Sequence, residues 1–128
     1  MTINEITSII IEESIYIHKK LGPGLLESVY EAVLYNRLVK RGFFVERQRD
    51  VEVNFEDENM GIGFRCDLIV ENRVIVELKS VQEVPKVTQK IVQTYLRLTD
   101  IQIGLIINFN EVKLVDGLQR IANNYIEQ

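Results

Sequence analysis

The sequence has little of several residue types that mark common protein classes. Its 128 residues include one cysteine, Cys66, and one histidine, His18. A disulfide framework and a cysteine-rich zinc site are therefore excluded, and no Ser-His-Asp or Cys-His arrangement stands out for nucleophilic hydrolysis. No apolar run approaches the roughly 20 residues that span a bilayer, and no basic segment precedes the first apolar residues. We therefore expect a cytoplasmic protein with no signal peptide and no membrane contact.

The composition is that of a folded protein with a mild excess of acid. Hydrophobic residues make up 46% of the chain, and 15 basic against 19 acidic side chains give a net charge of −4. This length and composition predict one domain over residues 1–128. The net charge argues against a protein that coats nucleic acid by charge alone. A nuclease stays open, because bound metal ions offset acidic ligands.

Apolar residues recur at helical spacing in four segments, and prolines or glycines bound several of them. We expect helices over residues 3–20, over residues 25–41, from Pro85 to about Leu98, and in a last segment marked by Leu118, Ile121, Ala122 and Tyr125. The tetrapeptide Leu21-Gly22-Pro23-Gly24 separates the first two.

Five other segments have the alternation or the continuous apolar character of strands. We expect strands over residues 51–55, 62–70, 73–79, 101–108 and 112–115. The resulting order, α-α-β-β-β-α-β-β-α, predicts an α/β (mixed α+β) fold with a central mixed sheet flanked by helices.

Charged side chains interrupt two of the apolar strands. By simple alternation, Glu77 and Lys79 share one face of their strand, and Asp67 lies on the neighbouring strand. Charges in such a place are costly unless they are paired or bound to metal. Two carboxylates suit Mg²⁺ or Mn²⁺. A structural ion pair at a strand end is the alternative. The same alternation predicts that Phe64, Cys66, Leu68 and Val70 share one face.

The connection between these two strands decides whether a site can exist. A two-residue turn at Glu71-Asn72 would set Asp67 opposite Val76, and Glu77 would then point to the far face. An odd connection over Glu71-Asn72-Arg73, or a bulge, sets Asp67 opposite Glu77. We predict the odd connection or the bulge, with Asn72 as the residue that best tolerates a positive φ.

Two helical features could belong to a site. Glu27 leans toward the apolar stripe of its helix, although a glutamate in a first turn is also favoured by the helix dipole, and pairing with Arg37 or Lys79 is a further alternative. The helix after Pro85 carries a polar face that could contact phosphates or could simply be solvated. Its residues are Lys86, Gln89, Lys90, Gln93 and Arg97.

The run from His18 to Tyr30 closely resembles the defining stretch of the GxxExxY proteins, in which Gly24, Glu27 and Tyr30 match the named motif. The resemblance covers nearly the whole chain, in order. It continues through Asp67-Leu68-Ile69-Val70, Val76-Glu77-Leu78-Lys79, Tyr95-Leu96 and Gly104-Leu105-Ile106-Ile107-Asn108-Phe109. That family is similar to a compact branch of the PD-(D/E)XK nuclease superfamily, which implies a restriction-endonuclease-like core.

The resemblance implies a role for each matching residue. Asp67, Glu77 and the Leu78 carbonyl would hold Mg²⁺ or Mn²⁺, Lys79 would act in catalysis, and Glu27 would hold a metal-bound water or a second ion. Tyr30 and Tyr95 would support the site. The implied partner is nucleic acid, with DNA favoured over RNA. A homodimer is also compatible with the resemblance. The alternative function is a non-catalytic interaction module with the same fold.

The chain departs from the superfamily pattern at two positions. The superfamily pattern has a proline before the aspartate, and this chain has Cys66 there. The residue at that position varies within the superfamily. Ile91 stands where many relatives place a glutamine, with Gln89 and Gln93 two residues to either side. The acidic residues and the lysine are nevertheless complete, which argues against a degenerate site.

Overall fold

The computed structural model describes residues 1–124 of the chain. Within these residues, five strands form one sheet in the order β1-β2-β3-β4-β5. They are β1 (Val45–Phe55), β2 (Glu58–Val70), β3 (Val74–Lys79), β4 (Ile103–Asn108) and β5 (Leu118–Ala122). Strands β3 and β4 pair in parallel, and the other three pairs are antiparallel. The predicted mixed sheet is confirmed.

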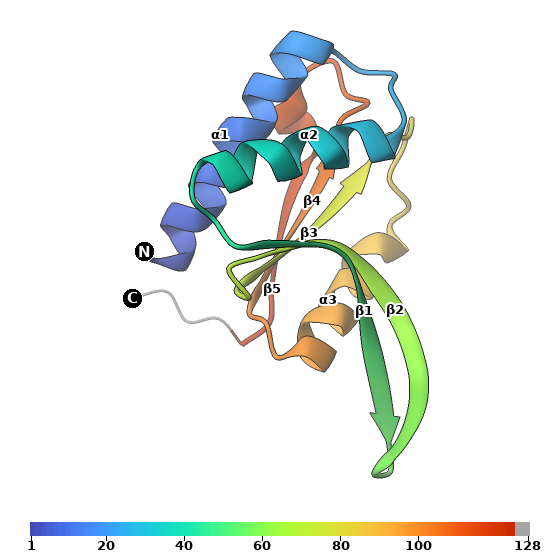
Figure 1. The fold of residues 1–128 in the computed structure, drawn as a ribbon. Coiled ribbons are helices and arrows are strands. Elements are labelled where there is room, and N and C mark those ends of the chain that lie inside the picture. Colours follow the sequence, from blue (N-terminus) through green and yellow to red (C-terminus); the bar gives the residue numbers. More distant parts are fainter. Residues whose placement is uncertain (125–128) are drawn as a thin grey trace.

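Helices cover both faces of the sheet (Figure 1). Helices α1 (Ile3–Leu21) and α2 (Glu27–Lys40) lie on one face, and α3 (Val87–Thr99) lies on the other. Helix α3 connects β3 to β4, as a parallel pair of neighbouring strands requires. The predicted α/β fold is therefore confirmed.

None of the helices in residues 1–124 is long and apolar enough to cross a membrane.

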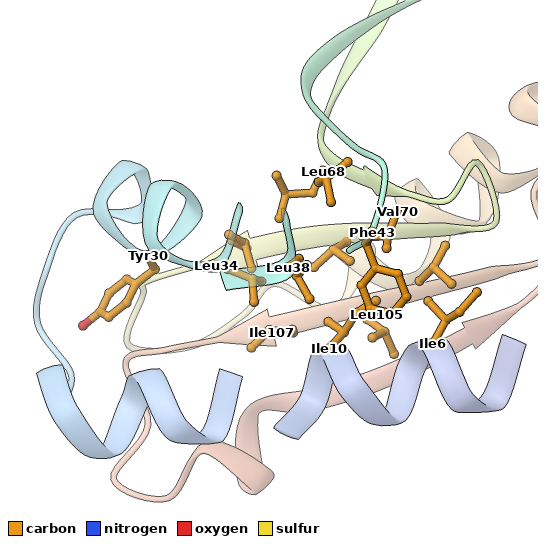
Figure 2. Close-up of a cluster of buried hydrophobic side chains, with 14 of the residues drawn as sticks. Ile6, Ile10, Tyr30, Leu34, Leu38, Phe43, Leu68, Val70, Leu105 and Ile107 are labelled. Carbon is orange, nitrogen blue, oxygen red and sulfur yellow. The ribbon is translucent and has the colours of Figure 1, made fainter. Parts of the chain in front are cut away.

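The larger core lies between the sheet and the first two helices (Figure 2). The apolar stripes of α1 and α2 supply Ile6, Ile10, Leu34 and Leu38, and these pack against side chains of the inner strands such as Leu105. The helical spacing of these positions puts them on the sheet-facing side of each helix. Burial of these side chains fixes α2 over β1, β2 and β3.

The smaller core lies under α3. Val92 and Leu96 of this helix pack against Ile75 and Ile106 of the central strands. At Gly104 of β4, a Cβ atom would lie 2.8 Å from a methyl carbon of Val92, so the absent side chain allows α3 its close approach. All residues of β4 are buried, as expected of a strand covered on both faces.

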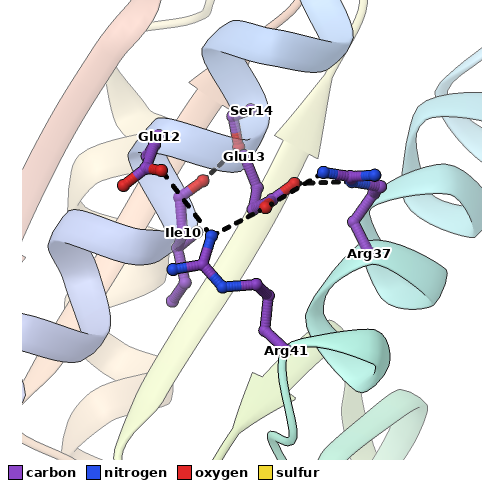
Figure 3. A network of polar contacts seen from close by, with 6 residues as sticks. All are labelled: Ile10, Glu12, Glu13, Ser14, Arg37 and Arg41. Atoms are coloured by element: carbon purple, nitrogen blue, oxygen red, sulfur yellow. Dashed lines mark hydrogen bonds and ion pairs between the residues drawn. The ribbon is translucent and has the colours of Figure 1, made fainter.

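A charged cluster joins α1 to α2 (Figure 3). The carboxylate of Glu13 accepts hydrogen bonds from Arg37 at 2.6 Å and from Arg41 at 2.9 Å. Its side chain is 4% exposed. Hydrogen bonding to Arg37 holds the pKa of Glu13 below its ordinary value despite burial. Arg37 is thus engaged by Glu13, so the alternative pairing of Glu27 with Arg37 is not found.

Two predicted elements near the end of the chain are wrong. The strand expected over residues 112–115 is a bend followed by a 3₁₀ turn, Leu114–Gly117, and the expected last helix is β5. Leu118 packs against the larger core and Ile121 against the smaller one, on opposite faces of the sheet. A helix would put them on one side, whereas a strand separates them. Pairing with the edge of β4 therefore overrides the helical spacing. Tyr125 lies outside the described residues.

Candidate functional site

The connection between β2 and β3 has an odd number of residues. Leu68 lies opposite Val76, and Val70 lies opposite Val74, so the three residues 71–73 make the turn. The N–H of Arg73 donates to the Val70 carbonyl at 3.0 Å. Both Glu71 and Asn72 adopt positive φ values, 55° and 53°. The predicted odd connection is confirmed, with two left-handed residues where one was expected.

This register brings the carboxylates of Asp67 and Glu77 together where the β2–β3 pairing ends. Oδ2 of Asp67 accepts a hydrogen bond from the N–H of Leu78 at 2.9 Å. Oε1 of Glu77 lies 3.5 Å from the backbone nitrogen of Asp67. Since the N–H and C=O of one strand residue point to the same edge, the Leu78 carbonyl also faces β2. Three oxygen-bearing groups thus border one gap between the strands.

The strand β2 changes faces at Asp67, contrary to the predicted alternation. Cys66 packs in the core under α3, whereas Leu68 and Val70 pack in the core under α1 and α2. Two residues apart in a regular strand would share a face. Gln48 of β1, which lies across from Asp67 between the pairs Arg47–Leu68 and Arg49–Cys66, has a φ of 49°. Both strands are therefore twisted at the position of the site.

Burial and like charge make this site unfavourable for two anions. Glu77 is 8% exposed. Burial, and then the negative charge of Asp67, raise the pKa of Glu77 to about 8, against smaller lowerings by the backbone N–H of Asp67 and by Lys79. Burial and the charge of Glu77 also raise the pKa of the Cys66 thiol to about 12. A bound cation would relieve this repulsion.

The donor set fits a hard divalent ion. Carboxylate and carbonyl oxygens are the ligands that Mg²⁺ and Mn²⁺ prefer, with water in the remaining positions. Within residues 1–124, no ion pair includes Asp67, Glu77 or Lys79, so the alternative of a structural ion pair is not found there. The described part of the chain also has no group of three or more His, Cys, Asp or Glu that could hold a metal. Asp67 and Glu77 would therefore rely on backbone and water.

Tyr30, the last residue of the Gly24-Glu27-Tyr30 motif, holds the turn that leads into α2. The hydroxyl of Tyr30 donates to the Gly22 carbonyl at 2.5 Å and accepts from the N–H of Leu25 at 3.2 Å. Its buried ring stacks on Phe109, with ring centroids 4.4 Å apart. The hydroxyl of Ser80 donates to the Leu25 carbonyl at 2.6 Å, which ties this turn to the end of β3. Tyr30 thus supports the turn.

Glu27 is the first residue of α2, at the end of that turn, and it is exposed. The structure does not bring it into a three-carboxylate cluster with Asp67 and Glu77. Its role through a water or a second ion stays a prediction.

Tyr95 extends from α3 toward the site. Its ring stacks on Phe64 of β2, with centroids 4.1 Å apart and planes inclined by 4°. Burial, and then the charge of Glu77, raise the pKa of its hydroxyl. The stack holds the side chain between α3 and β2, and a supporting role of Tyr95 in catalysis stays a prediction.

The polar face predicted to contact phosphates lies on the other side of α3. Lys86, Lys90, Gln93 and Arg97 are exposed. On a helical wheel they lie about 140–180° from Tyr95. Gln93 donates to the Ala122 carbonyl of β5 at 3.4 Å. This face is therefore not continuous with the side of α3 that Tyr95 presents to Glu77, and phosphate contact there stays a prediction.

The structure adds residues that the sequence did not single out. Nε2 of Gln48 donates to Oδ1 of Asp67 at 3.3 Å and to Oε1 of Glu31 at 2.5 Å. Glu31, on α2, is buried and also pairs with Arg47 at 3.1 Å. On the wheel of α2, Glu31 lies about 20° from Leu38, so its place in the apolar stripe was a readable signal. The sequence holds no such signal for Gln48.

The family model of the PD-(D/E)XK nuclease superfamily matches residues 4–121. No curated protein and no solved structure matches the chain.

Proposed function

Since the chain belongs to the PD-(D/E)XK nuclease superfamily, we propose that it is a metal-dependent nuclease that hydrolyses phosphodiester bonds of DNA, with RNA as a further substrate class. Within the superfamily, its motif at Gly24, Glu27 and Tyr30 favours the GxxExxY family. A cytoplasmic location and a homodimer are part of the same proposal.

One observation carries this proposal: the register of β2 and β3 sets the carboxylate of the half-buried Asp67 close to that of the buried Glu77. The raised pKa of Glu77 supports it, because two like charges in a desolvated place favour a cation between them. Residues whose pKa is strongly shifted by burial and by a specific charge gather at functional sites.

Each residue has a part in the proposed reaction. Asp67, Glu77 and the Leu78 carbonyl would hold Mg²⁺ or Mn²⁺, which supplies Lewis-acid activation of the phosphate. Lys79 follows Glu77 by two residues, so its ammonium lies on the same face of β3. It would donate to the phosphate oxygens on which negative charge increases in the transition state. Glu27, at the start of α2, would orient a water.

The test is a cleavage assay with purified protein on plasmid DNA, single-stranded DNA and RNA, with Mg²⁺, Mn²⁺ or EDTA. We expect cleavage that needs the metal. Lys79→Ala should fold and bind metal normally but cleave about 10²–10³-fold more slowly, because it loses stabilisation of the transition state alone. Asp67→Asn should lose both metal binding and activity. The control Lys113→Ala removes a lysine from the segment before the 3₁₀ turn and should cleave like the wild type.

Two results would contradict the proposal. Equal cleavage by wild type and Lys79→Ala would remove Lys79 from the mechanism. A wild type that binds neither Mg²⁺ nor Mn²⁺ at millimolar concentration and cleaves nothing would favour the non-catalytic interaction module.

A further inference from the structure

Gln48 has an unusual conformation for its place in the chain. Its φ of 49° lies in the left-handed region, which residues other than glycine rarely adopt. Glu56 and Asp57, which also have positive φ, occupy the tip of the β1–β2 hairpin, as do Glu71 and Asn72 in the next turn. Gln48 instead lies within β1. Such strain persists where the surrounding contacts require it, and it gathers at functional sites.

Packing does not hold Gln48 in this conformation, since the residue is exposed. Its contacts come from the side-chain amide, which donates to Asp67 and to Glu31. Both partners are carboxylates, so the NH₂ group must face them and the orientation of the amide is fixed by chemistry.

Glu31 gives this amide a rigid anchor. Its Oε2 accepts from Nε and Nη2 of Arg47 at 3.2 and 3.1 Å, and the residue is 6% exposed on the sheet-facing side of α2. The contacts therefore run from α2 through Gln48 to Asp67. They reach the oxygen of Asp67 that Leu78 does not hold.

The type of side chain at position 48 also matters. An arginine or lysine between Glu31 and Asp67 would neutralise the aspartate and compete with a cation. A neutral amide orients the carboxylate and leaves its charge available. Groups that orient ligands in this way set metal affinity in many proteins.

We propose that Gln48 is a positioning residue of the Asp67–Glu77 site, whose amide fixes the Asp67 carboxylate for a divalent cation by linking it to Glu31. This inference rests on the proposed metal site. Gln48 itself touches neither the ion nor the substrate.

The test compares Gln48→Gly with the wild type in two measurements. One is Mn²⁺ affinity by calorimetry, and the other is thermal stability in EDTA. Glycine accepts a φ of 49° without strain, so the metal-free variant should fold, although Oε1 of the buried Glu31 loses its hydrogen bond from the amide. The amide is lost, so the dissociation constant for Mn²⁺ should rise about 10–100-fold. A purely conformational role would leave the affinity unchanged. The matched control is Asp57→Gly, which relieves a φ of 63° at the hairpin tip and should leave Mn²⁺ affinity unchanged.

Two results would overturn the inference while leaving the proposed function intact. One is a Gln48→Gly variant that binds Mn²⁺ as tightly as the wild type. The other is an equal loss of affinity in Asp57→Gly. A wild type that binds no Mn²⁺ would instead overturn the metal site and the inference together.

Discussion

At the scale of single residues, three glutamates show how surroundings decide the state of one chemical group. Glu13 is buried, but hydrogen bonds from Arg37 and Arg41 hold its pKa low. Glu77 is buried beside another carboxylate, and its pKa rises to about 8. Glu27 is exposed at a helix start. Burial raises the pKa of both buried carboxyl groups, and the neighbouring group decides whether that rise persists, as beside Asp67, or is reversed, as beside Arg37.

The raised pKa of Glu77 predicts that metal-free protein loses stability as the pH rises. Between the ordinary value of 4.5 and about 8, the unfolded chain has released this proton and the folded chain keeps it. Unfolding then releases a proton, so the free energy of unfolding is highest below this window and falls across it. Urea unfolding in EDTA at about pH 5 and about pH 8.5 should differ by on the order of a few kcal/mol.

The variant Glu77→Gln serves as the control, because it cannot ionise. Its free energy of unfolding should vary less over this window than that of the wild type. An identical pH dependence in both proteins would show that Glu77 is not the group responsible.

At the scale of elements, α2 connects the charged cluster around Glu13 to the candidate site. The carboxylate of Glu13 on α1 accepts hydrogen bonds from Arg37 and Arg41 at the C-terminal end of α2. Glu31, near the start of α2, is linked through Gln48 to Asp67. Tyr30 fixes the turn that precedes α2. The placement of α2 therefore sets the surroundings of Asp67 from above one face of the sheet, while Tyr95 of α3 approaches from the other.

The charged cluster around Glu13 predicts that changes at two neighbouring glutamates affect the free energy of unfolding unequally. Glu13→Gln leaves two guanidinium groups without a buried carboxylate and should lower the free energy of unfolding by about 1–3 kcal/mol. Glu12 is 69% exposed and lies 3.6 Å from Arg41, so Glu12→Gln should change stability by less than about 0.5 kcal/mol. Urea denaturation at neutral pH measures both. Similar losses in the two variants would contradict the assigned role of Glu13.

At the scale of the whole molecule, the sheet divides the protein into two cores, and the candidate site lies where two of its strands stop pairing. Strands β2 and β3 pair from Val70 and Val74 only as far as Leu68 and Val76. Beyond that point, side-chain carboxylates replace the backbone ladder. A cation bound there would link the two strands and stabilise the folded state as a whole.

Mg²⁺ or Mn²⁺ should therefore raise the melting temperature by mass action. At about ten times the dissociation constant, the gain is about 1.4 kcal/mol, or about 5 °C for a chain of this size. A thermal scan at increasing metal concentration measures it, and Asp67→Asn should abolish the shift. A similar shift in that variant would place the metal elsewhere.

The sequence by itself determined a mixed sheet flanked by helices, because apolar periodicity follows from the local geometry of helix and strand and their order along the chain indicates the fold class. It also determined that an odd turn between β2 and β3 was needed if Asp67 and Glu77 were to meet, since alternation in a hairpin depends only on parity. These features come from neighbours along the chain, so a single sequence contains them.

Tertiary structure alone decided the rest. Leu118–Ala122 have helical spacing, but the open edge of β4 offered backbone hydrogen bonds that made them a strand. The twist at Gln48 and Asp67 moved Cys66 to the face opposite Leu68, which alternation could not predict. The link from Asp67 through Gln48 to Glu31 joins three elements. Such contacts depend on how distant segments pack, and no local pattern records that.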